Sequence, residues 1–183
     1  MYPISQKAWK HYRTSILDHE LNVAVMVIAN RLFPAGFDVS DDAPDSYEKL
    51  VQRFESGRRY VVYSGGADKT IFGDPEVNYC FRAWHDWCHW RGRFDFSFTG
   101  EYATYEMQCE HLVRVYGQGE RIERWKKILF ADVIGQRLHH DLTGTFPVDQ
   151  MKFVREFLSR HSVQSVDGVP MTAAVTRSAD AAE

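Results

Sequence analysis

The hydrophobic pattern of the N-terminal part of the chain has a helical period. It predicts a long helix from about Ser5 to Phe33. The apolar stripe consists of Ile16, Val23 and Val27, with Leu17, Leu21, Ala24 and Ile28 beside it. The segment Asp45-Ser46-Tyr47-Glu48 resembles a capping box, which predicts a short second helix ending near Glu55.

A change of period marks a small β insertion after these helices. Residues Arg59 to Tyr63 are rich in β-branched and aromatic side chains and predict a strand. The turn residues 64–68 follow, and Thr70 to Phe72 are expected to pair back as a hairpin. Two such short strands cannot form a domain, so the sheet is an accessory.

The rest of the chain predicts helices joined by short connections. Asp74-Pro75-Glu76 is a helix start with an Asp cap and proline in the first turn. The expected helices are Val77 to Trp90, Gly100 to Tyr116 with Thr99 as its cap, Glu120 to Leu142, and Pro147 to Arg160. We therefore expect an all-α fold, a helical bundle with a small inserted β-hairpin. Residues 1–161 form the single predicted domain, and 162–183 a disordered tail.

Composition excludes several classes of protein. The chain has 183 residues, 44% hydrophobic and 26% charged, which is enough to build a core. Its net charge of −3 gives no strong nucleic-acid signal. The longest apolar run, Val23 to Ala29, is far shorter than the ~20 residues of a membrane helix. No secretion signal is evident at Met1 to Ile4, and the three cysteines form no C-x-x-C pair, so we expect a cytoplasmic protein.

A pair of histidines is the strongest candidate for chemistry. His85 and His89 are four residues apart on a predicted helix, so both imidazoles can reach one metal ion. Asp86 lies about 100° further round that helix and can act as a ligand or a base. An aromatic core that merely hydrogen-bonds its histidines is the alternative.

Other helices carry polar groups that can join this pair. Glu101, in the first turn of the next helix, shares a face with Gln108, and Asp132 lies four residues before Gln136. Of His19 and Glu20, one is expected to point into the bundle. Metal sites in helical bundles are built by such convergence. The expected ligands are thus His85, His89, Glu101, Asp132 and His19.

Two motif families resemble parts of this pattern. The order His19 … His85-Asp86 … Asp132 resembles the H…HD…D signature of the HD-domain metal-dependent phosphohydrolases, which are all-helical. That resemblance implies these four residues as ligands of an ion that polarises a phosphate and supplies the attacking water. The segment His85-Asp86-Trp87-Cys88-His89 also looks like the H-E-x-x-H helix of zinc peptidases, with the shorter Asp in place of Glu and Glu101 as third ligand.

A broader resemblance is to a family of small bacteriophage-encoded proteins. It follows the pattern R-A-W-H-D-x-x-H … G-E … D-x-x-G-Q … F-P-x-D-Q, carried here by Arg82 to His89, Gly100-Glu101, Asp132 with Gly135-Gln136, and Phe146 to Gln150. The resemblance implies a phage origin and, with it, the host cytoplasm. It implies no reaction.

The favoured hypothesis is a metal-dependent hydrolase with a phosphoester or nucleotide substrate. A water activated by a divalent ion (Zn, Mn, Mg or Fe) would be the nucleophile, with Asp86 and Glu101 as the catalytic carboxylates. The side chains expected to meet a small anionic substrate are Arg82, Arg93, Gln108 and Gln136. Three alternatives stay open: an H-D-x-x-H peptidase, a ferritin-like di-iron protein, and a non-catalytic phage protein that binds a host partner and uses a metal or His cluster only for structure. The sequence leaves the oligomeric state undetermined.

Overall fold

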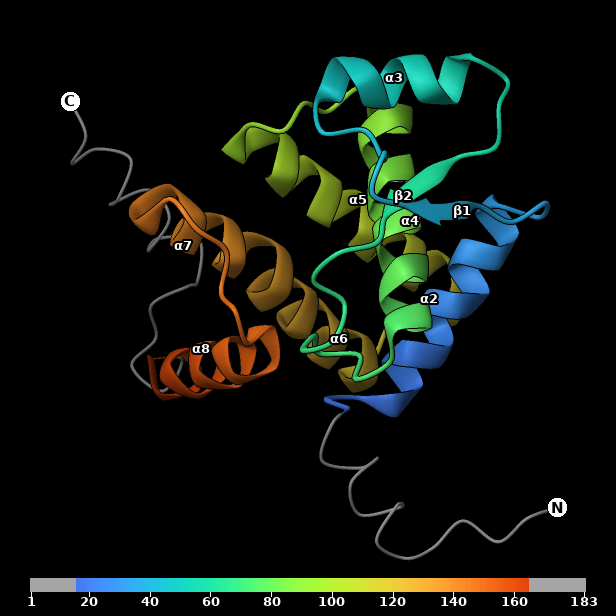
Figure 1. Ribbon diagram of the computed structural model, residues 1–183. Coiled ribbons are helices and arrows are strands. Elements are labelled where there is room, and N and C mark those ends of the chain that lie inside the picture. The colour runs from blue at the N-terminus through green and yellow to red at the C-terminus, as the bar shows by residue number, and fades with distance from the viewer. Residues whose placement is uncertain (1–15, 165–183) are drawn as a thin grey trace, which may run out of the picture.

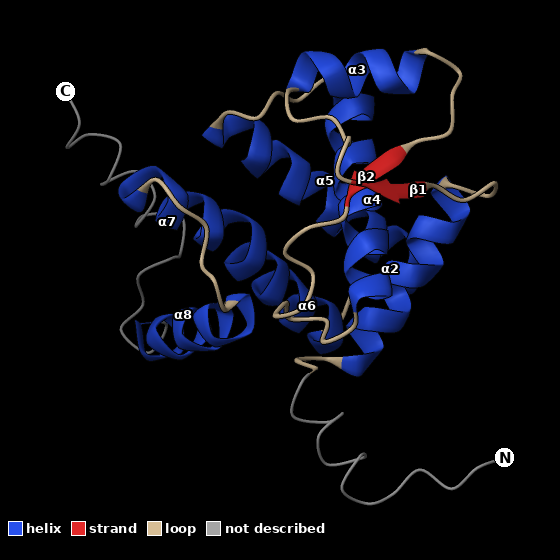
Figure 2. Ribbon diagram, viewed as in Figure 1, coloured by secondary structure: helices blue, strands red, loops and turns tan. Residues whose placement is uncertain are grey.

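The protein is mainly helical, as the sequence predicts. The computed structural model describes residues 16–164 (Figure 1). Its helices are α2 (His19–Leu32), α3 (Tyr47–Glu55), α4 (Pro75–Gly92), α5 (Phe98–Tyr116), α6 (Glu120–Phe130), α7 (Gln136–Thr143) and α8 (Gln150–Gln164). A π-helical turn, η1 (Ala131–Gly135), joins α6 to α7, and two short strands complete the fold, β1 (Asp38–Ser40) and β2 (Val61–Tyr63). Figure 2 shows how small the sheet is beside the helices.

Helix α4 is the centre of the fold, packed between α2 and α5 (Figure 1). Its start follows the sequence: Asp74 caps the helix by accepting a hydrogen bond from the backbone N–H of Glu76, and Pro75 occupies the first turn. Trp84 and Cys88, on one side of α4, are fully buried in the main apolar core. Burial of these large side chains fixes α4 and thereby the polar residues on its other side.

Helix α2 differs from the prediction in both its extent and its buried face. It begins at His19, and the predicted residues 5–15 lie outside the described part of the chain. Val23 is 48% exposed, whereas the buried positions are Leu21, Asn22, Ala24, Val25, Ile28 and Ala29. Helix α2 packs mainly against α4, and this contact selects its buried face.

The orientation of α2 about its own axis determines where its polar residues lie. His19 and Glu20 are both exposed, so the prediction that one of them points into the bundle is wrong. Glu20 forms ion pairs with Arg121 and Arg124 on α6 instead. Asp18 caps α2 and also pairs with Arg124, which ties the two helices together at the surface.

The β insertion contains the strand predicted over Arg59 to Tyr63, but with a different partner. Strand β2 pairs in parallel with β1, in the register Asp38 with Val61 and Ser40 with Tyr63. Thr70 to Phe72 form a turn instead of a strand, since the carbonyl of Ile71 accepts from the N–H of Leu17 at 2.9 Å. Ile71 and Phe72 are buried, so packing against α2 replaces the expected hairpin pairing.

The C-terminal helices begin and end close to their predicted bounds. Ser97, not Thr99, caps α5 by accepting from the N–H of Gly100. The single helix expected over 120–142 is interrupted by η1. Asp149 begins α8 by accepting from the N–H of Lys152, and the helix continues to Gln164, into the predicted tail. Residues 165–183 of that tail lie outside the described part.

No helix within residues 16–164 combines the length and apolar character that crossing a bilayer requires.

The C-terminal end of α4 generates a stability prediction. Arg93 follows the helix with φ 57° and ψ 38°, a left-handed conformation that costs a non-glycine residue about 1–2 kcal/mol. Glycine adopts this conformation without strain but gains more entropy on unfolding, which offsets part of the relief, so we expect Arg93→Gly to raise the free energy of unfolding by up to ~1 kcal/mol. The matched control is Arg91→Gly, an exposed change within the last turn of α4, which should lower it by roughly 0.5–1 kcal/mol. Urea unfolding of both variants measures the difference, and equal losses would contradict the prediction.

Candidate metal centre

One stripe of α4 lines a cavity of about 760 Å³. The stripe consists of Asn78, Phe81, Arg82, His85, Asp86 and His89. These positions recur at intervals that keep them on one helix face, beside the buried Trp84 and Cys88. The regular helix spacing therefore brings both predicted histidines to the same wall.

The corner between α4 and α5 orients His89. The Nδ1 of His89 lies 2.9 Å from the backbone oxygen of Phe94, and the N–H of Phe94 donates to the carbonyl of His89 at 3.0 Å. A carbonyl oxygen can only accept, so Nδ1 carries the hydrogen, and in the neutral ring Nε2 holds a lone pair. His89 is fully buried, which leaves that lone pair no water.

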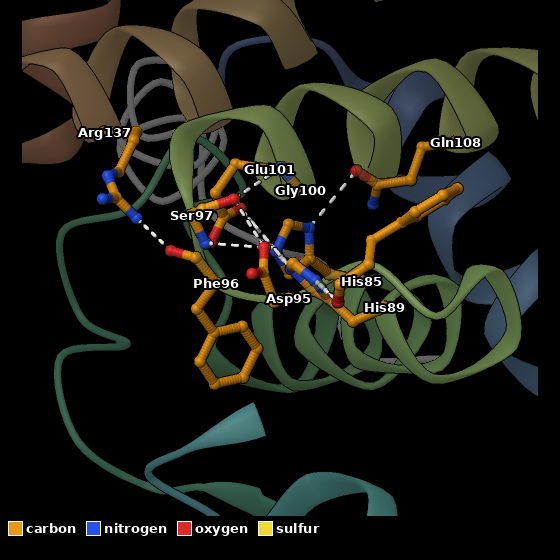
Figure 3. Close-up of polar contacts among 10 residues, drawn as sticks. His85, His89, Asp95, Phe96, Ser97, Gly100, Glu101, Gln108 and Arg137 are labelled. Atoms are coloured by element: carbon orange, nitrogen blue, oxygen red, sulfur yellow. Dashed lines mark hydrogen bonds and ion pairs between the residues drawn. The ribbon is translucent and has the colours of Figure 1, made fainter. Parts of the chain in front are cut away.

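A hydrogen-bond partner outside the ligand group, Gln108, orients His85, as the carbonyl of Phe94 orients His89. The Nδ1 of His85 lies 3.4 Å from Oε1 of Gln108 on α5, a long hydrogen bond in which the ring donates (Figure 3). Gln108 is completely buried behind the imidazole. The Nε2 of His85 consequently points the same way as that of His89, and the two atoms are 3.0 Å apart.

The first turn of α5 contains Glu101, the carboxylate of the group. Ser97 caps this helix, and Glu101 follows in its first turn, where the helix dipole favours negative charge. Gly100 is required here because a Cβ on it would lie 1.9 Å from the backbone oxygen of Asp95. Figure 3 shows Glu101 turned toward the two imidazoles.

Three ligand atoms therefore converge from two helices. Oε2 of Glu101 lies 3.2 Å from Nε2 of His85 and 3.5 Å from Nε2 of His89. Around one ion with bonds of about 2.0–2.1 Å, neighbouring ligand atoms are separated by about 2.9–3.4 Å, depending on the coordination angle. The observed 3.0, 3.2 and 3.5 Å match this spacing closely. The three side chains can hold a metal ion, and their identity alone does not select one metal.

The pKa shifts of Glu101 and His85 also indicate that this group needs positive charge. Burial by itself would raise the pKa of the Glu101 carboxyl, but hydrogen bonds and charges from His85 and His89 outweigh burial and hold that pKa well below its usual range. Burial opposes a charge on His85, yet the hydrogen bond and charge of Glu101 raise its pKa. The group thus contains a fixed negative charge that needs positive charge beside it, from a proton or a cation.

Asp86 is held separately, on the cavity wall. Its Oδ2 accepts a hydrogen bond from the hydroxyl of Tyr60 at 2.8 Å. Tyr60 is buried and its ring stacks on Phe54 at 4.1 Å, so this hydroxyl has a fixed position. Burial raises the pKa of Asp86. Asp86 is not within the three-ligand group, and it faces the cavity beside it.

The opposite wall of the cavity is formed by η1 and α7. Asp132 in η1 is 7% exposed and accepts from Nε2 of Gln136 at 2.7 Å. Both residues line the cavity, as does Arg137, whose guanidinium donates to the carbonyl of Phe96. Asp132 is a predicted ligand that the structure leaves outside the group of His85, His89 and Glu101.

The remaining predicted site residues lie in different surroundings. Arg82 lines the cavity, with its guanidinium donating to the carbonyls of Tyr63 and Gly65 at 2.6 Å. Gln108 contacts His85 from behind instead of facing the cavity. His19 lies exposed at the start of α2 and Arg93 at the end of α4, and neither lines this cavity.

Four contributors to the site were missed in the sequence. They are Tyr60, the carbonyl of Phe94, Asn78 and Arg137. Asn78 had a signal, since it lies one helical turn before Arg82 and two turns before His85 on the cavity stripe. In the structure its buried Nδ2 has no hydrogen-bond partner among the described residues. A backbone carbonyl carries no signal in the residue letters.

Comparisons with models of protein families, with curated proteins and with solved structures found no match to this chain. A function must therefore be inferred from the chemistry of the site. Two imidazoles and one carboxylate on one wall of a cavity form a donor set typical of metal sites that keep coordination positions open for water or substrate.

The close approach at Gly100 generates a prediction. We expect Gly100→Ala to weaken metal binding and to lower the melting temperature, because the new methyl group would displace Asp95 and shift the first turn of α5 that carries Glu101. Thr99→Ala, an exposed change one residue earlier, is the control and should leave both properties unchanged. Calorimetric titration with Zn²⁺ and thermal unfolding test both variants. Wild-type affinity in a folded Gly100→Ala protein would contradict the prediction.

Proposed function

We propose that the protein is a metal-dependent hydrolase whose ion is held by His85, His89 and Glu101. The observation that carries this proposal is the convergence of their three ligand atoms at 3.0–3.5 Å, with each imidazole oriented by an outer partner. Without a proton or cation, two nitrogen lone pairs and a carboxylate would face one another in a buried space, at a large electrostatic cost.

The open side of the group supports a hydrolytic role. All three residues line the cavity, so the remaining coordination positions of an ion would face it. A bound divalent ion lowers the pKa of its water and makes hydroxide available at neutral pH. Asp86, held by Tyr60, lies on the same wall and is the residue we assign to accept the proton of that water.

Two arginines of the cavity and a bound cation would favour an anionic substrate. Arg82 and Arg137 line the cavity together with the ligand group, and guanidinium groups and metal ions both attract phosphoryl oxygens. Arg82 is committed to backbone carbonyls, so it supplies charge and shape more than free hydrogen bonds. A phosphoester of small size is the substrate class we propose.

A zinc peptidase is the second candidate. Its supporting observation is topological: His85 and His89 lie one turn apart on α4, and Glu101 comes from the following helix. Asp86 stands where those enzymes have Glu, and the shorter side chain places the carboxylate further from the ion. The HD-domain assignment would require His19, which is exposed and outside the group. A di-iron centre needs more carboxylates than the single Glu101 among the described residues of this group.

Metal binding is the first test. We expect the wild type, stripped with a chelator, to bind Zn²⁺ or Mn²⁺ and to melt at a higher temperature when loaded. Glu101→Gln keeps the shape of the side chain but removes its charge. It should weaken metal binding by more than the roughly 100-fold loss that can follow when a residue hydrogen-bonded to a ligand is replaced. His19→Ala, which removes a histidine far from the group, should bind as the wild type does. Equal affinity in Glu101→Gln and wild type would contradict the proposed site.

Activity is tested with the loaded protein on the same variants. We expect hydrolysis of p-nitrophenyl phosphate or bis(p-nitrophenyl) phosphate by the wild type and His19→Ala, and none by Glu101→Gln. Cleavage of peptides instead would select the second candidate. A tightly bound metal without hydrolysis of either panel would overturn the catalytic proposal and leave a structural metal.

A further inference from the structure

Two carboxyl groups of the cavity have opposite environments. Glu101 lies between two imidazoles and stays ionised. Asp132, on the other wall, has one hydrogen-bond partner among the described residues, the neutral amide of Gln136. Carboxyl groups whose surroundings differ in this way take different roles in enzymes, one as a fixed charge and one as a proton carrier.

The backbone gives Asp132 its place in the cavity. η1 contains one more residue per turn than an α-helix, and such turns are frequent at functional sites. Within it, Asp132 and Gln136 both reach the cavity wall. Gly135 lets α8 pack closely from outside, since a Cβ there would lie 3.1 Å from the ring of Phe157. The turn is thus fixed from behind, and the Asp132 carboxyl faces the cavity.

Among the described residues, no charged side chain forms an ion pair with Asp132. Burial raises the pKa of Asp132 to about 7, and the hydrogen bond from Gln136 and the charges of His85 and Arg82, which act in the opposite direction, do not outweigh it. The guanidinium of Arg82 is bonded to the carbonyls of Tyr63, Gly65 and Gly66. The titratable and charged groups that line the same cavity from every packed element are Asp45, Tyr63, Arg82, His85, Asp86, His89, Glu101, Arg137 and His140.

We infer that Asp132 is the general acid of this site and gives its proton to the leaving group. The inference rests on the proposed hydrolase function. As metal-bound hydroxide forms a bond to phosphorus, the bond from phosphorus to the leaving oxygen breaks with its electron pair on oxygen. The carboxyl proton of Asp132 moves to that oxygen and releases an alcohol. The proton that Asp86 accepts from the attacking water returns through solvent in the cavity to the Asp132 carboxyl, so each cycle consumes one water and leaves both carboxyl groups as they began.

The separation of Asp132 from the ligand group fits this role. A proton donor must lie across the substrate from the nucleophile, and Asp132 lines the same cavity as the ligands without joining them. The buried amide of Gln136 fixes the carboxyl while leaving its second oxygen available to substrate. Gln136 is accordingly a positioning residue in this scheme.

The test uses substrates that differ in their need for an acid. Asp132→Asn keeps an oxygen to accept from Gln136 and so disturbs the fold little. With Mn²⁺ or Zn²⁺ loaded, we expect kcat/KM of Asp132→Asn to fall about 100-fold or more for phenyl phosphate. It should fall only a few-fold for p-nitrophenyl phosphate, whose leaving group needs no proton. The control His140→Ala, on the same wall, should change both rates by the same factor.

The outcomes separate the two proposals. A wild type that hydrolyses neither compound overturns the hydrolase function. An active wild type whose Asp132→Asn variant loses both activities equally overturns the general-acid role and indicates a ligand or structural role.

A stability measurement tests the proton itself, with or without activity. A carboxyl that holds its proton to about pH 7 in the folded state, against its ordinary value of 3.8 when unfolded, loses stabilisation as the pH rises between these values. The melting temperature of Asp132→Asn relative to wild type should therefore rise from pH 4 to pH 8. A difference that stays constant over this range would overturn the assignment.

Discussion

The hydrogen bond from His89 to the carbonyl of Phe94 determines the chemistry of the whole site. Because a carbonyl only accepts, this contact fixes which nitrogen of the ring carries hydrogen, and it directs the other one at His85 and Glu101. Glu101 is close because the connection from α4 to α5 is short, and both helices are anchored by buried aromatic packing. Two nitrogen lone pairs and a negative charge thus face one another on the largely buried wall of the cavity. Positive charge, from a proton or a cation, stabilises such an arrangement.

The carboxyl groups of the cavity have different partners. Glu101 contacts both imidazoles, which hold its pKa low, whereas burial raises the pKa of Asp132, whose hydrogen-bond partner is the amide of Gln136. Asp86, one residue from a ligand, accepts from the hydroxyl of Tyr60. In the mechanism that we propose, one cavity supplies a ligand, a base and an acid, although all three side chains carry the same functional group.

The sequence predicted the parts of the site that depend on local spacing. Asp74 and Pro75 indicated where α4 begins, and the interval between His85 and His89 placed both rings on one face. The outward rotation of His19 could not be predicted, since the buried face of α2 is chosen by packing against α4. Tyr60 reaches Asp86 only because β2 pairs in parallel with β1, a long-range choice that the local pattern near Thr70 does not reveal.

The π turn at 131–135 also sets the phase between α6 and α7. Figure 1 shows these helices following one path, so the extra residue changes direction little. Within the turn the backbone hydrogen bonds span one residue more than in an α-helix, so each residue rotates the chain by less than the roughly 100° of the flanking helices. Its side chains are therefore aimed differently from those of an uninterrupted α-helix, and Asp132 reaches the cavity that Gln136 and Arg137 also line. A local change of helical period thus lets one continuous path carry both the buried face of α6 and a cavity-lining face on α7.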